Sequence, residues 1–185
     1  MNQLPGNKSV RVFFALWPDE AEQIALAAWQ PSLHERCGGR VMRADTLHAT
    51  FVFIGNVGLH RLEDLQLTVP EVEGEAFDLT LDAAHYWGHN HIVYAAPNQV
   101  PLQLVQLLHD LEQCLLKHRF NFDKQPFKPH ITLLRRAQWD DTPLPEMNKV
   151  IWRANHFALM QSSPDENGAN YRVLAKFNLV KSAHQ

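Results

Sequence analysis

Two short segments of this chain share the pattern H-x-T-x, with the letters HATF beginning at His48 and HITL beginning at His130. In a β-strand, residues two positions apart lie on the same face, while their neighbours point the other way. Each segment, as a strand, therefore presents a histidine and a threonine together: His48 with Thr50, and His130 with Thr132. If the two strands face each other, two imidazoles and two hydroxyls surround a single cavity.

These residue types suit the hydrolysis of a phosphodiester. Opening a cyclic phosphate requires one group to take a proton from water and another to give a proton to the departing ribose oxygen. Histidine, with an ordinary pKa of about 6.5, can supply both the neutral and the charged form near neutral pH. Threonine hydroxyls can donate hydrogen bonds to the non-bridging oxygens as negative charge develops there. The scheme requires no metal, and the near-symmetric motifs do not say which histidine gives the proton.

The motif segments lie in a series of predicted strands and helices. Apolar runs and alternation predict strands at residues 11–16, 47–54, 76–84, 91–96, 128–134, 153–161 and 171–180. Helical spacing predicts helices at residues 20–33, 59–67 and 100–118, the last with an apolar stripe of Leu102, Val105, Leu108, Leu111 and Leu115. Turn formers predict turns at residues 37–39 and 88–90 and an exposed loop at 162–170.

The order strand, helix, motif strand, further strand occurs twice, and His130 follows His48 by 82 positions. A unit of this size that occurs twice indicates two pseudo-symmetric lobes, because a solenoid needs at least three units. We therefore expect an α+β fold: a bilobal pseudo-twofold domain whose two antiparallel-rich sheets form a central cleft, with helices outside. The single domain would span residues 1–185, with its motif strands near 47–54 and 128–135.

Composition narrows the class of protein. A chain of 185 residues with 45% hydrophobic content is one domain by length, and no run reaches the roughly 18 apolar residues that a membrane span needs. Residues 1–9 lack the apolar centre of a signal peptide. Cys37 and Cys114 lie in no metal or redox motif, which fits free thiols in the cytoplasm. The net charge of −3 means that any nucleic-acid contact must be local.

One segment, residues 117–136, is locally basic, with six Lys or Arg residues against one acidic residue. Lys128 and Arg135 are the candidate phosphate-binding residues in it, although such runs are often only a solvated surface. Arg135 lies five residues from His130, so a regular strand would turn it to the opposite face, and Arg136 would suit the alternation better. A bulge or the end of the strand must bring Arg135 round to the histidine side.

Several aromatic residues are candidates for stacking on the terminal bases of an RNA. Phe13 and Phe53 are the predicted substrate-binding aromatics, although strand aromatics more often belong to the core; Trp17, Tyr86 and Trp87 are further candidates.

Three other histidines, His85, His89 and His91, form the pattern H-x3-H-x-H, which could hold a metal. No carboxylate or thiolate lies close to them in sequence, and a histidine-rich hairpin turn explains the pattern better. The sequence also lacks the nucleotide-binding P-loop, serine-esterase and dinucleotide-binding motifs. We therefore predict no metal and no cofactor.

The motifs and their surroundings resemble the two-histidine phosphoesterases, and within them the bacterial RNA 2′,3′-cyclic phosphodiesterases once named 2′-5′ RNA ligases. The resemblance covers nearly the whole chain. It is carried by four blocks, RVFFAL at 11–16, LHATFVFIG at 47–55, PFKPHITLLR at 126–135 and YRVLAKF at 171–177. We also expect a monomer with no obligate protein partner.

By this resemblance the substrates are RNA ends with a 2′,3′-cyclic phosphate, the products are 2′-phosphomonoesters, and 2′-5′ joining of RNA ends is an in vitro activity. It further implies that His48 donates the proton to the leaving 3′ oxygen and that His130 accepts a proton from water. Two other interpretations stay open. The same site could act on small cyclic nucleotides or 2′,5′-oligonucleotides, or the cleft could bind RNA ends without catalysis.

Overall fold

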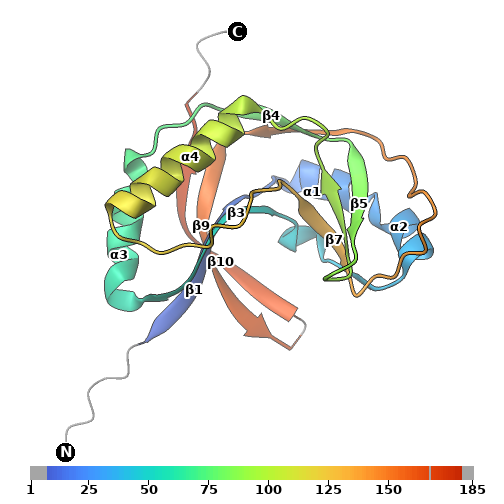
Figure 1. Cartoon of the computed structure of the whole chain (residues 1–185), viewed down its shortest axis with the longest axis horizontal. Helices are drawn as coiled ribbons and strands as arrows, with labels where there is room; N and C mark the ends of the chain where they lie inside the picture. Colours follow the sequence, from blue (N-terminus) through green and yellow to red (C-terminus); the bar gives the residue numbers. More distant parts are fainter. Residues whose placement is uncertain (1–7, 167, 181–185) are drawn as a thin grey trace, which may run out of the picture.

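The computed structural model describes residues 8–166 and 168–180, which form two four-stranded antiparallel sheets, a two-stranded sheet and outer helices (Figure 1). The strands are β1 (Ser9–Leu16), β2 (Arg40–Val41), β3 (Ala49–Gly58), β4 (Phe77–Leu81), β5 (Ala83–Trp87), β6 (Ile92–Ala96), β7 (Ile131–Arg135), β8 (Val150–Ala154), β9 (His156–Asp165) and β10 (Gly168–Asn178). The helices are α1 (Glu20–Ala27), α2 (Gln30–Cys37), α3 (Leu59–Thr68) and α4 (Leu102–Lys117), with short 3-10 turns at Ala44–Thr46 and Val69–Glu71.

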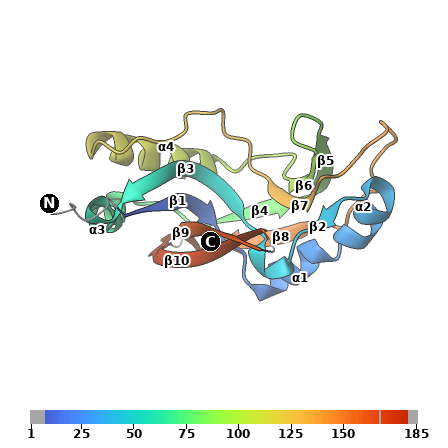
Figure 2. The ribbon, with the colours of Figure 1, turned by 90° about the horizontal axis from the view of Figure 1, so that it is seen from below.

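The two motif strands belong to different sheets. The first sheet has the order β10-β9-β1-β3 and the second the order β2-β7-β6-β5. In each sheet the motif strand pairs antiparallel with the strand that begins its repeat, β3 with β1 and β7 with β6. The predicted α+β class with antiparallel sheets is confirmed. The lobes also exchange elements, because β2 joins the second sheet while β9 and β10 join the first (Figure 2).

Each motif strand contains a bulge at the equivalent position. The pairing register between β1 and β3 skips Phe51, and that between β6 and β7 skips Leu133, in both cases three residues after the motif histidine. A second shift between β1 and β3 skips Ile54. Each skipped residue and the one after it are both buried, whereas a regular strand would alternate. The alternation is thereby reset, and the fifth residue after each histidine, Phe53 or Arg135, returns to the histidine side.

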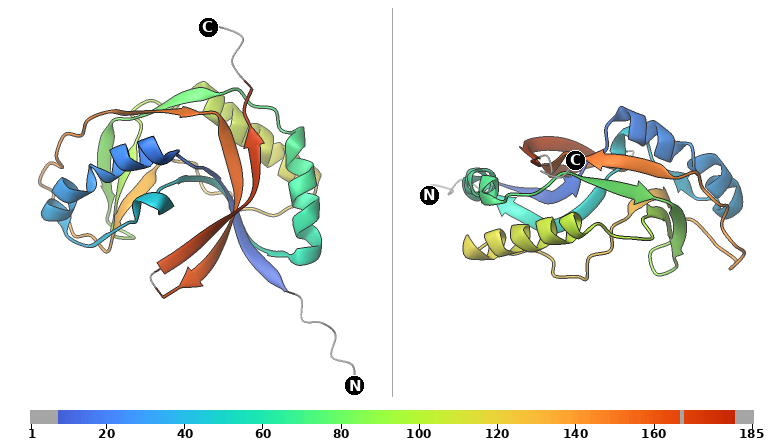
Figure 3. Two further views of the ribbon diagram at one scale, coloured as in Figure 1. Left: turned by 180° about the vertical axis from the view of Figure 1, so that it is seen from behind. Right: turned by 90° about the horizontal axis from the view of Figure 1, so that it is seen from above.

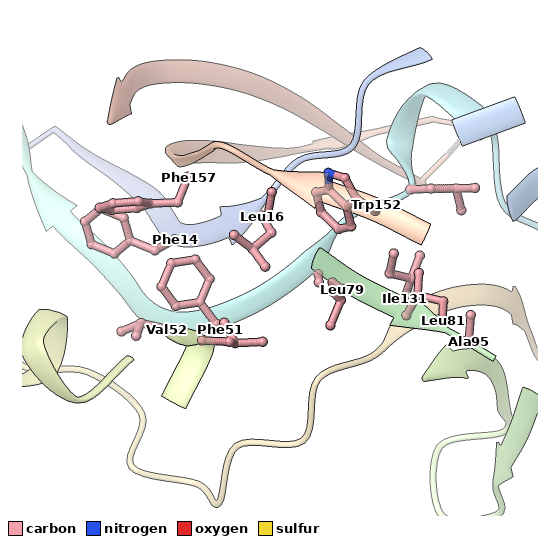
Figure 4. Packing of buried hydrophobic residues seen from close by; sticks show 14 of the residues in the cluster. Phe14, Leu16, Phe51, Val52, Leu79, Leu81, Ala95, Ile131, Trp152 and Phe157 are labelled. Atoms are coloured by element: carbon pink, nitrogen blue, oxygen red, sulfur yellow. The ribbon is translucent and has the colours of Figure 1, made fainter. Parts of the chain in front are cut away.

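A continuous hydrophobic core joins the two sheets on the side away from the motif histidines. Figure 4 shows Phe14, Phe51 and Phe157 at one end of this core and Ile131 and Ala95 at the other, with further buried side chains between them. The core fixes the two motif strands relative to each other. Helices cover the outside of the fold, as the two views of Figure 3 show.

The predicted helix at 20–33 is wrong, because the segment forms two helices. The helix α1 ends at Ala27, and α2 begins at Gln30 with Pro31 in its first turn. Proline has no backbone N–H to donate and its ring clashes with the carbonyl four residues earlier, so it starts a helix more readily than it continues one.

Two predicted strands are also divided. The segment 76–84 breaks at Asp82 into β4 and β5, and the segment 153–161 breaks at Asn155 between β8 and β9. In both places the chain leaves the small β4–β8 sheet and enters one of the two large sheets. Alternating polarity predicts that a segment is extended, but it does not predict that the segment changes sheet.

The predicted loop at 162–170 is instead the outer part of the β9–β10 hairpin, paired from Gly168 with Asp165 to Tyr171 with Ser162. Its polar residues resemble a loop because this end of the hairpin projects beyond the core. The predicted stripe on α4 is also partly wrong, since Leu102 and Val105 are exposed. The buried positions are Leu104, Leu107, Leu111, Cys114 and Leu115. Within the described ranges, no helix has the length and apolarity needed to cross a membrane.

Candidate active site

A small cavity of about 100 Å³ lies between the two large sheets, at the ends of the two motif strands. Its lining residues are Met42, Thr46, His48, Thr50, His130, Thr132, Arg135 and Tyr171. The structure thus brings together both predicted His–Thr pairs and Arg135. The threonines come from β3 and β7, so each sheet contributes one hydroxyl to the same space.

The two histidines are held in the same way. Each stands immediately before its motif strand, and each ring donates a hydrogen bond from Nδ1 to the backbone carbonyl two residues earlier, at Thr46 or Lys128, over 2.7 Å in both cases. A carbonyl oxygen only accepts, so Nδ1 carries the hydrogen. The other ring nitrogen, Nε2, is therefore left for chemistry in both lobes.

Aromatic rings enclose His48. The indole of Trp17 is stacked on its imidazole, with ring centroids 4.9 Å apart and planes 4° from parallel. The rings of Phe13 and Tyr171 complete the enclosure at 5.3 Å and 4.9 Å. Phe13 and Trp17, which the sequence offers for base stacking, thus pack on His48, where they fix the plane of its ring and exclude water from one side.

A second, smaller set of rings surrounds His130. Trp87 and Tyr94 meet its imidazole edge-on, with centroids 4.6 Å and 5.6 Å away. Tyr94 is the cross-strand partner of Thr132, so both point to the histidine side of the second sheet. The predicted candidate Tyr86 points away from the site, where its hydroxyl donates to the carbonyl of Ala137 over 3.2 Å.

The surroundings lower the pKa of both histidines. Burial lowers the pKa of His48 to about 4, although the hydrogen bond that its ring donates to the Thr46 carbonyl acts to raise it; the nearby charges of Arg135 and His130 lower it further. Burial also lowers the pKa of His130, again with a contribution from Arg135. The larger fall is at His48. At neutral pH, without an anion in the cavity, both rings are neutral.

The other predicted substrate-binding residues differ in their positions. Arg135 reaches the cavity through the bulge at Leu133, one of the two routes that the sequence required. Phe53 packs on the same side of the first sheet beside Phe13, with the Arg11 guanidinium 4.7 Å from its ring centre, but does not line the cavity. The exposed Lys128 side chain does not line it either; this residue contributes its carbonyl.

The sequence did not single out Tyr171, Met42 or Thr46, which also line the cavity. Tyr171 lies within one of the blocks that resemble the family, and nothing else in the sequence indicates that it belongs to the site. Thr46 contributes the carbonyl that holds His48, a backbone role that residue types do not reveal.

His85, His89 and His91, the three histidines with metal-like spacing, do not group around a common point. His85 stacks on Tyr94, and His91 Nδ1 lies 2.8 Å from the Tyr86 hydroxyl. The predicted turn at 88–90 is present.

Among the described residues, a different trio could hold a metal ion: Glu71, Cys114 and His118, whose ligand atoms lie within 4.8 Å of one another. None of the three lines the cavity of the motif histidines. Glu71 also forms an ion pair of 2.7 Å with Lys117, which already partly neutralises its carboxylate.

The fold and the paired His–Thr motifs define a two-histidine phosphoesterase. The family model of the 2′-5′ RNA ligase superfamily matches residues 17–166, and the chain belongs to this superfamily. It is 30% identical over 172 residues to the Escherichia coli K12 protein named RNA 2′,3′-cyclic phosphodiesterase, covering 92% of this chain and 97% of that protein. A Thermus thermophilus protein of the same name is 31% identical over 184 residues, covering 92% of this chain and 90% of that protein.

Solved structures agree with this assignment. Apo E. coli LigT superposes with a TM-score of 0.81 at 29% identity, covering 94% of this chain and 99% of that one. E. coli LigT complexed with 3′-AMP gives a TM-score of 0.78 at 28% identity over the same shares. The MHV ns2 PDE domain, at 14% identity and a TM-score of 0.57, shares the fold alone.

Removing the charge of Arg135 tests the electrostatics of the site. We expect Arg135→Gln to raise the pKa of both His48 and His130, because a nearby cation disfavours the protonated imidazole. NMR titration of the imidazole C–H signals measures both values. As a control, Arg153→Gln removes an exposed arginine that pairs with Asp78. A fall in both pKa values, or an equal change in the control, would contradict the assignment.

Proposed function

We propose that the protein hydrolyses RNA ends carrying a 2′,3′-cyclic phosphate to 2′-phosphomonoesters, by acid–base catalysis with His48 and His130. The observation that carries the proposal is the one cavity lined by both Nδ1-anchored histidines and both motif threonines. The names of the two curated relatives support the substrate. The 2′-5′ joining activity of the family follows from the same chemistry when the 5′-hydroxyl of another RNA end replaces water: its oxygen attacks phosphorus, the bond to the 3′ oxygen breaks, and a 2′-5′ diester remains.

In this reaction His130 Nε2 takes a proton from water as the water oxygen attacks phosphorus. The bond between phosphorus and the 3′ oxygen breaks, and His48 Nε2 gives its proton to that oxygen, which leaves a 2′-phosphate and a free 3′-hydroxyl. Thr50 and Thr132 donate to the non-bridging oxygens, and Arg135 offsets their negative charge. The lowered pKa of His48 makes it the stronger acid once protonated, but it also reduces the fraction of the free enzyme in which His48 carries the proton.

The low pKa of His48 requires that the substrate itself help to protonate it. A cyclic phosphate carries one negative charge, which favours the imidazolium form of a histidine beside it. Binding therefore raises the pKa of His48 from about 4. The Trp17 ring stacked on His48 stabilises the same charged form through its π-face. The substrate thus promotes the protonation of the histidine that then donates a proton to it.

The size of the cavity bears on the competing substrates. A volume of about 100 Å³ accommodates a cyclic phosphate group but not a whole nucleotide. The chemistry is therefore confined to the phosphate, and the remainder of the substrate lies outside. The two buried free cysteines fit a reducing compartment, so the proposal includes the cytoplasm as the location. We also propose that the active form is a monomer.

Replacing either histidine should abolish most of the activity. We expect His48→Ala and His130→Ala each to lower kcat on an oligoribonucleotide 2′,3′-cyclic phosphate by about 10²- to 10⁴-fold, the usual contribution of one proton transfer. Chromatographic identification of the product as a 2′- or 3′-phosphate tests the regiochemistry in the same assay. His109→Ala, an exposed histidine on α4, is the matched control and should retain full activity. Substantial turnover by either active-site variant would refute the mechanism.

The same two variants can be distinguished by changing the leaving group. In a substrate with sulfur in place of the 3′ bridging oxygen, the leaving group is a thiolate, which needs no proton. We expect this substrate to restore much of the rate in His48→Ala and none in His130→Ala. Restoration in His130→Ala alone would reverse the two roles while leaving the pair itself intact.

Metal removal gives a further test. The proposed steps use only side chains of this chain, so we expect excess EDTA to leave the rate unchanged within about twofold. A steady-state assay before and after dialysis against the chelator measures this. A large loss of rate that Zn²⁺ restores would contradict metal-independent catalysis.

A further inference from the structure

A second, larger cavity of about 290 Å³ adjoins the catalytic one. The two share Met42, Thr46, Arg135 and Tyr171 as lining residues, so they lie side by side, and we call the catalytic cavity the narrow end and the larger cavity the wide end. The narrow end holds the histidines. The narrow end has room for little more than the reacting phosphate. The rest of a bound strand can therefore extend into the wide end beside it.

Arginines line the wide end. Three of its nine described lining residues are Arg40, Arg43 and Arg135. Arg40 is the cross-strand partner of Arg135 in the pairing of β2 with β7, which places two guanidinium groups on neighbouring strands. An anion between such groups reduces their mutual repulsion. Arg43 is oriented by a two-bond contact with Asp45, at 3.0 Å and 2.6 Å.

Both sheets form the walls of this cavity. Arg40, Val41 and Arg135 belong to the second sheet, whereas Gly168, Ala169 and Tyr171 belong to the β9–β10 hairpin of the first. The Arg40 guanidinium lies directly against Gly168, where a Cβ atom would come within 3.0 Å of Nη1. The exchange of β2 between the lobes thus places Arg40 at the junction of the two sheets.

We propose that this arginine-lined cavity binds the phosphodiester group that precedes the terminal nucleotide, so that the enzyme recognises the end of a strand rather than a free cyclic nucleotide. The inference rests on the proposed function. A planar guanidinium with several N–H donors binds a phosphate diester through two parallel hydrogen bonds, which a lysine cannot do. Arg40 is the specificity residue, because it lines only the wide end, whereas Arg135 lines both.

The experiment combines a change in the protein with a change in the substrate. Two dinucleotides carry the same 2′,3′-cyclic end, one with a natural internal phosphodiester and one with an uncharged methylphosphonate in its place. Their kcat/KM values are measured with the wild-type enzyme and with Arg40→Gln. We expect the wild type to prefer the charged linkage by about tenfold, the effect of one lost hydrogen bond to a charged group, and the variant to lose most of this preference.

The preference is a ratio measured on one protein preparation, so any loss of folded enzyme cancels. If Arg40→Gln proves inactive, Arg40→Lys gives the ratio, and we expect an intermediate preference because the charge remains while the fork is lost. Arg153→Gln, the control for loss of one positive charge, should keep the wild-type preference. An unchanged preference in the Arg40 variants, or none in the wild type, would overturn the proposal. If the wild type opens neither cyclic phosphate, the proposed function itself fails.

Discussion

The site depends on one backbone irregularity that occurs twice. A strand that contains H-x-T and continues regularly would turn the residue five places after the histidine to the core. The bulges at Phe51 and Leu133 reverse this, so that the apolar core and the polar cavity are built from the same short strands. Two adjacent buried residues then anchor each strand, and the position after them faces the cavity side. The histidine, the threonine and the residue after the bulge thus form one row in each lobe.

The backbone symmetry is combined with different side chains at equivalent positions. After the bulge the second lobe carries Arg135, which lines both cavities, whereas the first lobe carries the apolar Phe53. The two histidines have the same backbone anchor, but one lies among three aromatic rings and the other between two. Symmetric motifs in unequal surroundings can take the unequal roles of acid and base. This difference is a property of the structure, and the motifs alone do not contain it.

The sequence predicted the features that depend on local patterns. The motif strands, α3, α4 and the turn before β6 follow from periodicity and turn formers, and the His–Thr pairs follow from alternation. It did not predict which sheet each strand joins. Two residues of β2 carry too little pattern to show that they pair with β7, and the polar end of the β9–β10 hairpin resembles a loop. The wide cavity is lined in part by those two elements, so no local pattern predicts it.

The low pKa of His48 restricts how the enzyme can work. A histidine with a pKa of about 4 is protonated in only about one molecule in a thousand at neutral pH, by the ordinary relation between pKa and charge. If the substrate anion supplies the missing stabilisation, the proton donor is available mainly when a phosphate occupies the cavity. The same enclosure that lowers the pKa also makes the imidazolium a stronger acid, which suits the proposed transfer of its proton to the 3′ oxygen. Burial of His48 thus limits the charged form in the free enzyme, and the charge of the bound phosphate has to stabilise that form in the complex.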